Sequence, residues 1–266
     1  MKKSKLRSYL FLVLSIGSFS LAAQNTLNQK GEEKIPAAGK HKFMLIPFEP
    51  RMYMSEIDHV INKETRMGGK EIKYAFRDGI NEQLYKSLKS QGTVVDLMDD
   101  TTKTKKDLAE IYQHLVLEYM KVPDQAHYKP PVKEKQEKNI KNGQIIDETN
   151  TDARFMNAKI DNPGLVPHLY KKYKSDIFVF INQLDINSSA NRGATELTAT
   201  KDGFRRIVVH YTVYTYDAKE INSGIAEIQF PVAINDPKKI VNGYFSKLAQ
   251  IIADRINLAL APPKSK

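Results

Sequence analysis

The sequence of 266 residues contains no cysteine. This absence excludes disulfide bonds, catalysis by a thiolate, metal sites built on cysteine, and a lipid attached to an amino-terminal cysteine. A secreted chain without disulfides depends on its core for stability, and hydrophobic residues make up 41% of this one. We therefore expect a folded protein with a substantial core and no covalent cross-links.

Common catalytic motifs are also missing. The sequence contains neither the HExxH zinc motif nor the G-x-S-x-G and G-x-G-x-x-G patterns. Residues 66–70 resemble a glycine-rich phosphate loop but lack the spacing of a P-loop, so we interpret them as a flexible loop. No two of the six histidines have the helical spacing of metal ligands: His41, His59, His114, His127, His168 and His210. These absences predict no catalytic residue, no cofactor and no metal.

Two groups of polar residues still need an interpretation. Asp96, Asp99 and Asp100 follow a predicted strand, where carboxylates can bind metal or act as acid and base. A threonine-rich helix start comes directly after them, which favours capping of backbone amides instead. His210 lies within a predicted strand, and we expect a packed core histidine there.

Long apolar runs are scarce. Residues 1–23 combine four cations, an apolar stretch at 9–16 and small residues at 20–23, which predicts a secretory signal cleaved after Ala22 or Ala23. An uncleaved anchor helix is the alternative. No later run reaches the ~20 residues that a membrane-spanning helix needs, so we expect no transmembrane segment. The protein is then periplasmic, either free or peripheral to the outer membrane, and export separates it from nucleic acid.

The charge balance is mildly basic. The net charge is +10, and four of these charges lie in the signal, which leaves +6 for the rest. Cations and acids are interleaved, so ordinary solubility is favoured over attraction to anionic lipid or polysaccharide.

The apolar pattern after the signal predicts one α/β domain. A flexible polar leader is expected at 24–41, and the domain at 42–261, with a charged, proline-bearing insertion at 122–161. Alternating or continuous apolar residues predict strands at 42–48, 93–98, 177–181, 207–216 and 225–232. Apolar residues with helical spacing predict helices at 72–88, 107–120, 165–174 and 238–260. Strands joined through helices pair in parallel and the last two form a hairpin, which predicts a mixed sheet of about five strands flanked by helices.

Several segments carry a resemblance to known envelope proteins. The opening strand ends in Pro-Phe at 47–48, and the helix at 72–88 leads through Gly92 into the strand Thr-Val-Val-Asp at 93–96. A Ser-Asp turn at 175–176 introduces the next strand, and an aspartate opens the turn within 214–221. This pattern resembles the amino-terminal domain of TolB, the periplasmic domain of the curli-pore protein CsgG, and the lipoprotein activators of penicillin-binding proteins.

The chain also departs from these families. It has no cysteine for lipid attachment, no following β-propeller and no evident transmembrane hairpins, and the insertion at 122–161 is foreign to them. The resemblance implies a non-enzymatic envelope protein that binds another protein.

One loop supplies the candidates for partner contact. Methionine and tyrosine are common at protein interfaces, and four of them lie between the first strand and the first helix: Met52, Tyr53, Met54 and Met67. The alternative is that they cover the sheet edge as ordinary core. We expect binding or assembly in the envelope, with envelope proteins as partners and a homo-oligomer left open. A periplasmic hydrolase or metal-dependent enzyme and a carrier of an apolar ligand are the alternative functions.

Overall fold

The computed structural model describes residues 41–98, 101–126, 154–188 and 203–261. All of them lie in the compact unit Pro36–Lys266. The predicted signal, the leader up to residue 40 and most of the predicted insertion therefore lie outside the described residues. None of the helices within these ranges is both long and apolar enough to span a bilayer.

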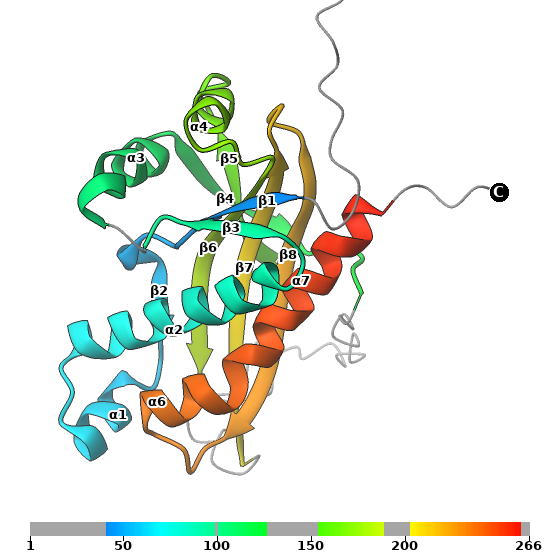
Figure 1. Ribbon diagram of the computed structural model, residues 1–266. Coiled ribbons are helices and arrows are strands. Elements are labelled where there is room, and N and C mark those ends of the chain that lie inside the picture. Colours follow the sequence, from blue (N-terminus) through cyan, green and yellow to red (C-terminus); the bar gives the residue numbers. More distant parts are fainter. Residues whose placement is uncertain (1–40, 99–100, 127–153, 189–202, 262–266) are drawn as a thin grey trace, which may run out of the picture. The chain divides into compact units, whose positions relative to one another are not determined.

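A mixed sheet forms the centre of the described unit (Figure 1). Its strands are β1 (Lys42–Ile46), β2 (Tyr53–Ser55), β3 (Thr93–Asp96), β6 (Ile177–Asn187), β7 (Phe204–Thr215) and β8 (Glu220–Pro231). The order is β3-β1-β6-β7-β8, with β2 paired to the later part of β6. β1 runs parallel to β3 and β6, whereas β7 and β8 are antiparallel to their neighbours. This mixed sheet confirms the predicted α/β class.

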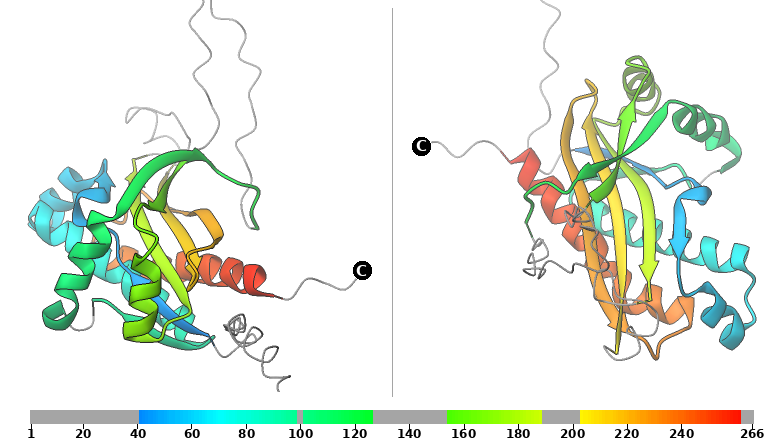
Figure 2. Two further views of the ribbon diagram at one scale, coloured as in Figure 1. Left: turned by 90° about the horizontal axis from the view of Figure 1, so that it is seen from above. Right: turned by 180° about the vertical axis from the view of Figure 1, so that it is seen from behind.

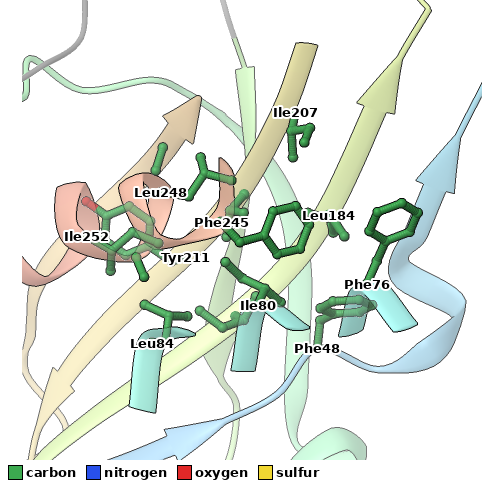
Figure 3. Packing of buried hydrophobic residues seen from close by; sticks show 14 of the residues in the cluster. Phe48, Phe76, Ile80, Leu84, Leu184, Ile207, Tyr211, Phe245, Leu248 and Ile252 are labelled. Atoms are coloured by element: carbon green, nitrogen blue, oxygen red, sulfur yellow. The ribbon is translucent and has the colours of Figure 1, made fainter. Parts of the chain in front are cut away.

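Helices cover one face of the sheet. They are α1 (Asp58–Thr65), α2 (Gly69–Lys89), α6 (Pro237–Ile240), the π-helical turn η2 (Val241–Phe245) and α7 (Ser246–Leu260). The predicted four-residue repeat of α2 is confirmed, because Phe76, Ile80 and Leu84 are all buried in the main core. Figure 3 shows these side chains meeting those of α7 over the strands β6 and β7. α2 and the π-helical turn η2 approach closely at Gly79, where an added Cβ would lie 2.6 Å from Val241 Cγ2.

The opposite face carries two helices and a two-stranded ribbon. The helices are α3 (Thr101–Gln113) and α4 (Leu165–Tyr173), and the ribbon consists of the antiparallel strands β4 (Leu115–Lys121) and β5 (Arg154–Ile160). Figure 2 shows the ribbon across this face of β6, β7 and β8. A second apolar cluster, with Met44, Phe178 and Phe180 pointing away from the main core, packs beneath α3 and α4.

Several predicted boundaries are wrong. The helix expected at 107–120 ends at Gln113, and 115–121 is the strand β4. Leu115 and Tyr119 fit both a helical stripe and one face of a strand, and pairing with β5 selects the strand. The insertion expected at 122–161 is also too long, because 154–160 forms β5 with four buried residues. The connection 51–69 additionally contains η1 (Pro50–Met52), β2 and α1, which the sequence did not predict.

The chain after β4 is fixed to the main sheet by one buried arginine. Arg255 of α7 donates from Nε to the carbonyl of Ala126 at 2.7 Å and from Nη1 to Gln125 Oε1 at 2.9 Å. Gln125 in turn donates from Nε2 to the carbonyl of Ile225 in β8 at 3.0 Å. Residues 122–126 are therefore part of the packed unit rather than of a solvated insertion.

Candidate functional site

A β-bulge in β6 places polar side chains on the ribbon side of the sheet. The pairing of β6 with β7 shifts between Ile181 and Gln183, so Asn182 is the extra residue. Before the bulge, odd-numbered side chains such as Ile181 enter the main core, and after it even-numbered ones such as Leu184 do so. Asn182, Gln183 and Asp185 consequently all face the ribbon.

Polar side chains of β6 and β7 bond to the backbone of β5 along the edge that does not face β4, although β5 does not pair with either strand. The amide of Met156 donates to His210 Nδ1 at 2.8 Å, and Asn182 Nδ2 donates to the Met156 carbonyl at 2.9 Å. Two residues further along, the same pattern repeats at Ala158, whose amide donates to Thr212 Oγ1 at 3.2 Å and whose carbonyl accepts from Tyr214 at 2.8 Å. Side chains of β6 and β7 thus satisfy the backbone groups that β5 turns away from β4.

Tyr214 is suited to this donor role. Burial, with the charge of Glu220 adding to it, raises the pKa of the Tyr214 hydroxyl to about 12. The hydroxyl therefore stays protonated and keeps donating to the Ala158 carbonyl throughout the neutral range.

His210 is buried, and both of its ring nitrogens have partners. A backbone amide can only donate, so Nδ1 accepts from Met156 and the proton lies on Nε2. Nε2 faces Asp185 Oδ2 at 3.0 Å, and Gln183 Nε2 donates to Asp185 Oδ1 at 2.7 Å. A histidine in this state has no nitrogen left to take a proton from a substrate, so the geometry favours the core role expected for it.

A small hollow lies where β1 ends, between η1, α3, the ribbon and the bulge. It encloses about 270 Å³ including its open mouth, with room inside for about one water molecule. Its lining residues are Glu49, Arg51, Met52, Tyr112, Leu115, Leu117, Ile181 and Asn182. Arg51 Nε donates to Glu49 Oε2 at 2.7 Å. The hollow is too small for the apolar ligand that a carrier would enclose.

The floor of this region is an internal network rather than an open site. Arg77 of α2 is buried and donates from Nε to the Phe48 carbonyl at 2.8 Å and from Nη2 to the Tyr112 hydroxyl at 3.1 Å. Tyr112 donates to the Pro47 carbonyl at 2.8 Å. Burial raises the pKa of Tyr112, and the charge of Arg77 opposes that rise. These bonds close the carboxyl end of β1, where α/β sheets often bind ligands.

The four predicted contact residues separate in the structure. Tyr53 is buried in the main core, stacked on Phe76, and its hydroxyl donates to Asp58 Oδ1 at 2.6 Å. Met52 and Met67 are partly buried against the same core. Met54 alone is strongly exposed, at 54%.

Exposed apolar side chains gather around β4. Of the six large hydrophobic residues exposed in the described ranges, three lie in this seven-residue strand: Val116 (47%), Tyr119 (52%) and Met120 (39%). Met54 pairs in register with Asp185, and the Tyr119 hydroxyl lies 3.3 Å from Gln183 Nε2. Met54 and Tyr119 therefore flank the same polar pair. Because side chains alternate along a strand, Val116 and Met120 lie on one face of β4 and Tyr119 on the other. We call Met54, Val116, Tyr119 and Met120, which lie on both sides of this strand, the ribbon patch.

The acidic candidates have internal partners. Asp96 accepts from Asn81 Nδ2 at 2.6 Å and from the amide of Met98 at 2.8 Å, which is the backbone-capping role expected for it. Asp99 and Asp100 lie outside the described residues. Within the ranges that the structure describes, no three histidine or acidic side chains are close enough to hold a metal ion.

Sequence reasoning missed the polar half of β6. The strand was expected to end at 181, whereas it continues to Asn187. The signal was present in the alternation of Asn182, Gln183 and Asp185 with Leu184 and Ile186, but the bulge interrupts its period.

Comparisons with known proteins find no family model that matches this chain, no characterised protein similar to it and no solved structure like it. The resemblance to TolB and CsgG modules therefore stays a prediction.

Proposed function

We propose that this chain is a non-enzymatic protein-binding or assembly module of the cell envelope that works in the periplasm. The observation that carries the proposal is the ribbon patch, because large exposed apolar side chains are concentrated on the short strand β4, with Met54 of β2 beside the same polar pair. Burying a side chain of this size is worth about 1.5–3 kcal/mol. Exposed apolar clusters rimmed by polar residues are typical of protein interaction sites.

The composition of the patch supports the same proposal. Methionine and tyrosine are enriched at the centres of protein interfaces, and three of its four members are of these types. Gln183 and Asp185 lie beside Met54 and Tyr119, and the partly exposed carboxylate of Asp185 adds a polar group next to the apolar side chains.

The chemistry beside the patch favours binding over catalysis. His210 and Asp185 are engaged with each other and with Met156 and Gln183, so their polar atoms support the fold of the ribbon. The signal expected at 1–23 and the resemblance to envelope modules supply the compartment of the proposal.

Chemical cross-linking in isolated envelopes tests the proposal. The full chain should cross-link to an envelope protein, and the double variant Met54→Glu/Tyr119→Glu should lose that partner because it places two charges in the patch. Leu258→Glu is the matched control, since Leu258 is an exposed apolar residue of α7 at 63%. Retention of the partner by the double variant, or purification of the chain with a bound metal or small molecule and no protein, would refute the proposal.

A further inference from the structure

The outer edge of β4 has free backbone groups. Among the described residues β4 pairs only with β5. The Asp161 amide donates to the His114 carbonyl, which makes 114 and 161 a hydrogen-bonded pair of the ribbon. Because such pairs alternate in an antiparallel ladder, residues 116, 118 and 120 bond to β5. Leu117 and Tyr119 then direct their amides and carbonyls outward. The amides of Met156 and Ala158 on β5 bond to His210 and Thr212 rather than to β4, which agrees with this alternation.

This edge lacks the features that usually prevent strand addition. Edge strands are normally blunted by proline, by bulges or by charged side chains. β4 has the sequence LVLEYMK, with no proline, and its register with β5 is unbroken over seven pairs. Its one acid, Glu118, forms an ion pair with Lys159 on β5. Five of its seven residues are apolar or aromatic, which is the composition of a strand that pairs well.

Positive charge at one end of the β4 edge indicates what kind of partner strand could pair with it. Lys121 and Arg154 are paired across the ribbon, and both are exposed. Arg154 has no acidic partner among the residues that the structure describes. The chain is also basic, at +6 once the expected signal is removed. An incoming segment with an acid near this end is favoured by the local cations and by the net charge.

A second copy of the chain fits less well. Antiparallel pairing of two β4 strands along their full length places Leu115 opposite Lys121 and Glu118 opposite Glu118 of the other copy. Like charges directly opposite each other destabilise a sheet, and both copies carry the same net positive charge.

We propose that an extended, acidic and apolar segment of a partner protein adds to β4 as the third strand of the ribbon. This inference rests on the proposed function and specifies its mode of recognition. The outward amides of Leu117 and Tyr119 pair with the backbone of the partner. Apolar side chains on one face of the partner strand pack beside Tyr119, those on its other face pack beside Val116 and Met120, and its acid lies by Lys121 and Arg154.

Selection from a displayed library of random seven-residue peptides, matched to the length of β4, tests the mode with the purified chain. Enriched peptides should alternate apolar residues and contain aspartate or glutamate. Amide exchange should then slow at Leu117 and Tyr119, while residues 116, 118 and 120, already bonded to β5, stay unchanged. The inference would be overturned by enrichment of basic peptides or of peptides with helical spacing of apolar residues. It would also be overturned if amide exchange slowed equally at residues 116 to 120.

Tyr119→Pro and Tyr119→Ala separate the backbone from the side chain. Proline removes an outward amide without breaking a bond to β5, so peptide affinity should fall by more than about tenfold. Alanine keeps the amide and should cost less. If the proline variant does not fold by circular dichroism, Val116→Lys provides the second test, since an edge lysine opposes strand addition. Equal affinity of these variants and the parent chain contradicts strand addition.

Two further readouts separate the outcomes. If light scattering shows a dimer of the parent chain and a monomer of Tyr119→Pro, the edge of β4 binds a second copy of the chain and the inference of a partner segment is wrong. In envelopes, a photo-cross-linking residue placed at Val116 should capture a partner, whereas one placed at Leu258 should not. Capture from a cross-linking residue at Met54 but not from one at Val116 overturns strand addition and leaves the proposed function standing. Capture only from Leu258, or from no position, overturns both.

Discussion

Thr212 is the best single position for testing how the ribbon is held on the sheet. Its fully buried hydroxyl accepts from Asn182 Nδ2 at 2.8 Å and from the Ala158 amide at 3.2 Å, and donates to Asn157 Oδ1 at 2.6 Å. Thr212→Val keeps the shape of the side chain and removes all three bonds. Each bond contributes about 1 kcal/mol, and groups left buried without a partner add to the loss.

We therefore expect Thr212→Val to lower the free energy of unfolding by about 3–4 kcal/mol, a large part of the ~5–15 kcal/mol typical of a domain. Tyr214→Phe is the matched control, because it removes one bond, to the Ala158 carbonyl, and should cost about 1 kcal/mol. Urea unfolding followed by circular dichroism measures both values. A loss below about 1 kcal/mol for Thr212→Val would refute the idea that these bonds hold the ribbon.

Three further predictions concern other parts of the chain. Burial opposes ionisation of Asp107, but bonds from Lys172 and its neighbour Tyr173 outweigh this and keep the pKa of Asp107 below its ordinary value. Ionised Asp107 therefore stabilises the fold above the ordinary carboxyl pKa, and this stabilisation is lost as the pH falls below that value. Asp107→Asn should lower the free energy of unfolding by about 2 kcal/mol at pH 7 and by much less near pH 3, as measured by urea unfolding. Gly79→Ala should lower the free energy of unfolding by about 1–3 kcal/mol, because the new methyl group clashes with Val241. Adding Val241→Ala should restore the melting temperature. If the double variant melts as low as Gly79→Ala alone, the clash with Val241 is not the cause. Mass spectrometry of the envelope protein should find a start at Ala23 or Gln24, and an intact Met1 would contradict the signal prediction.

Local sequence patterns predicted the helices and strands whose buried apolar residues repeat at one regular spacing. The α2 helix was predictable because Phe76, Ile80 and Leu84 repeat every four residues, whereas a strand would also place the charged Asp78 and Glu82 on their face. The hairpin β7–β8 was predictable because Ile207, Val209, Tyr211 and Val213 place apolar side chains on one face of β7 at the two-residue spacing of a strand. In both elements the local pattern and the tertiary packing agree.

The ribbon and the site could not be predicted in the same way. Only pairing between β4 and β5, which are 32 residues apart in the chain, decides that 115–121 is a strand. β5 buries Asn157 as well as apolar residues, so its sequence looks like solvated loop. The roles of Met52 and Tyr53 depended on the short β2 strand, whose pairing with β6 turns Tyr53 into the core and Met54 outward.

The bulge at Asn182 also makes the sheet sensitive to the length of β6. If β6 paired with β7 in a regular two-residue period at its present length, every side chain after Asn182 would change sides. Leu184 and Ile186 would then point at the ribbon, and Gln183 and Asp185 would enter the main core. Deleting Asn182 would instead remove the bulge and the bonds of Asn182 to Met156 and Thr212, while Leu184 and Ile186 stay in the core. Homologous chains that keep this fold should therefore lose the bulge only together with one residue between Ile181 and Leu184.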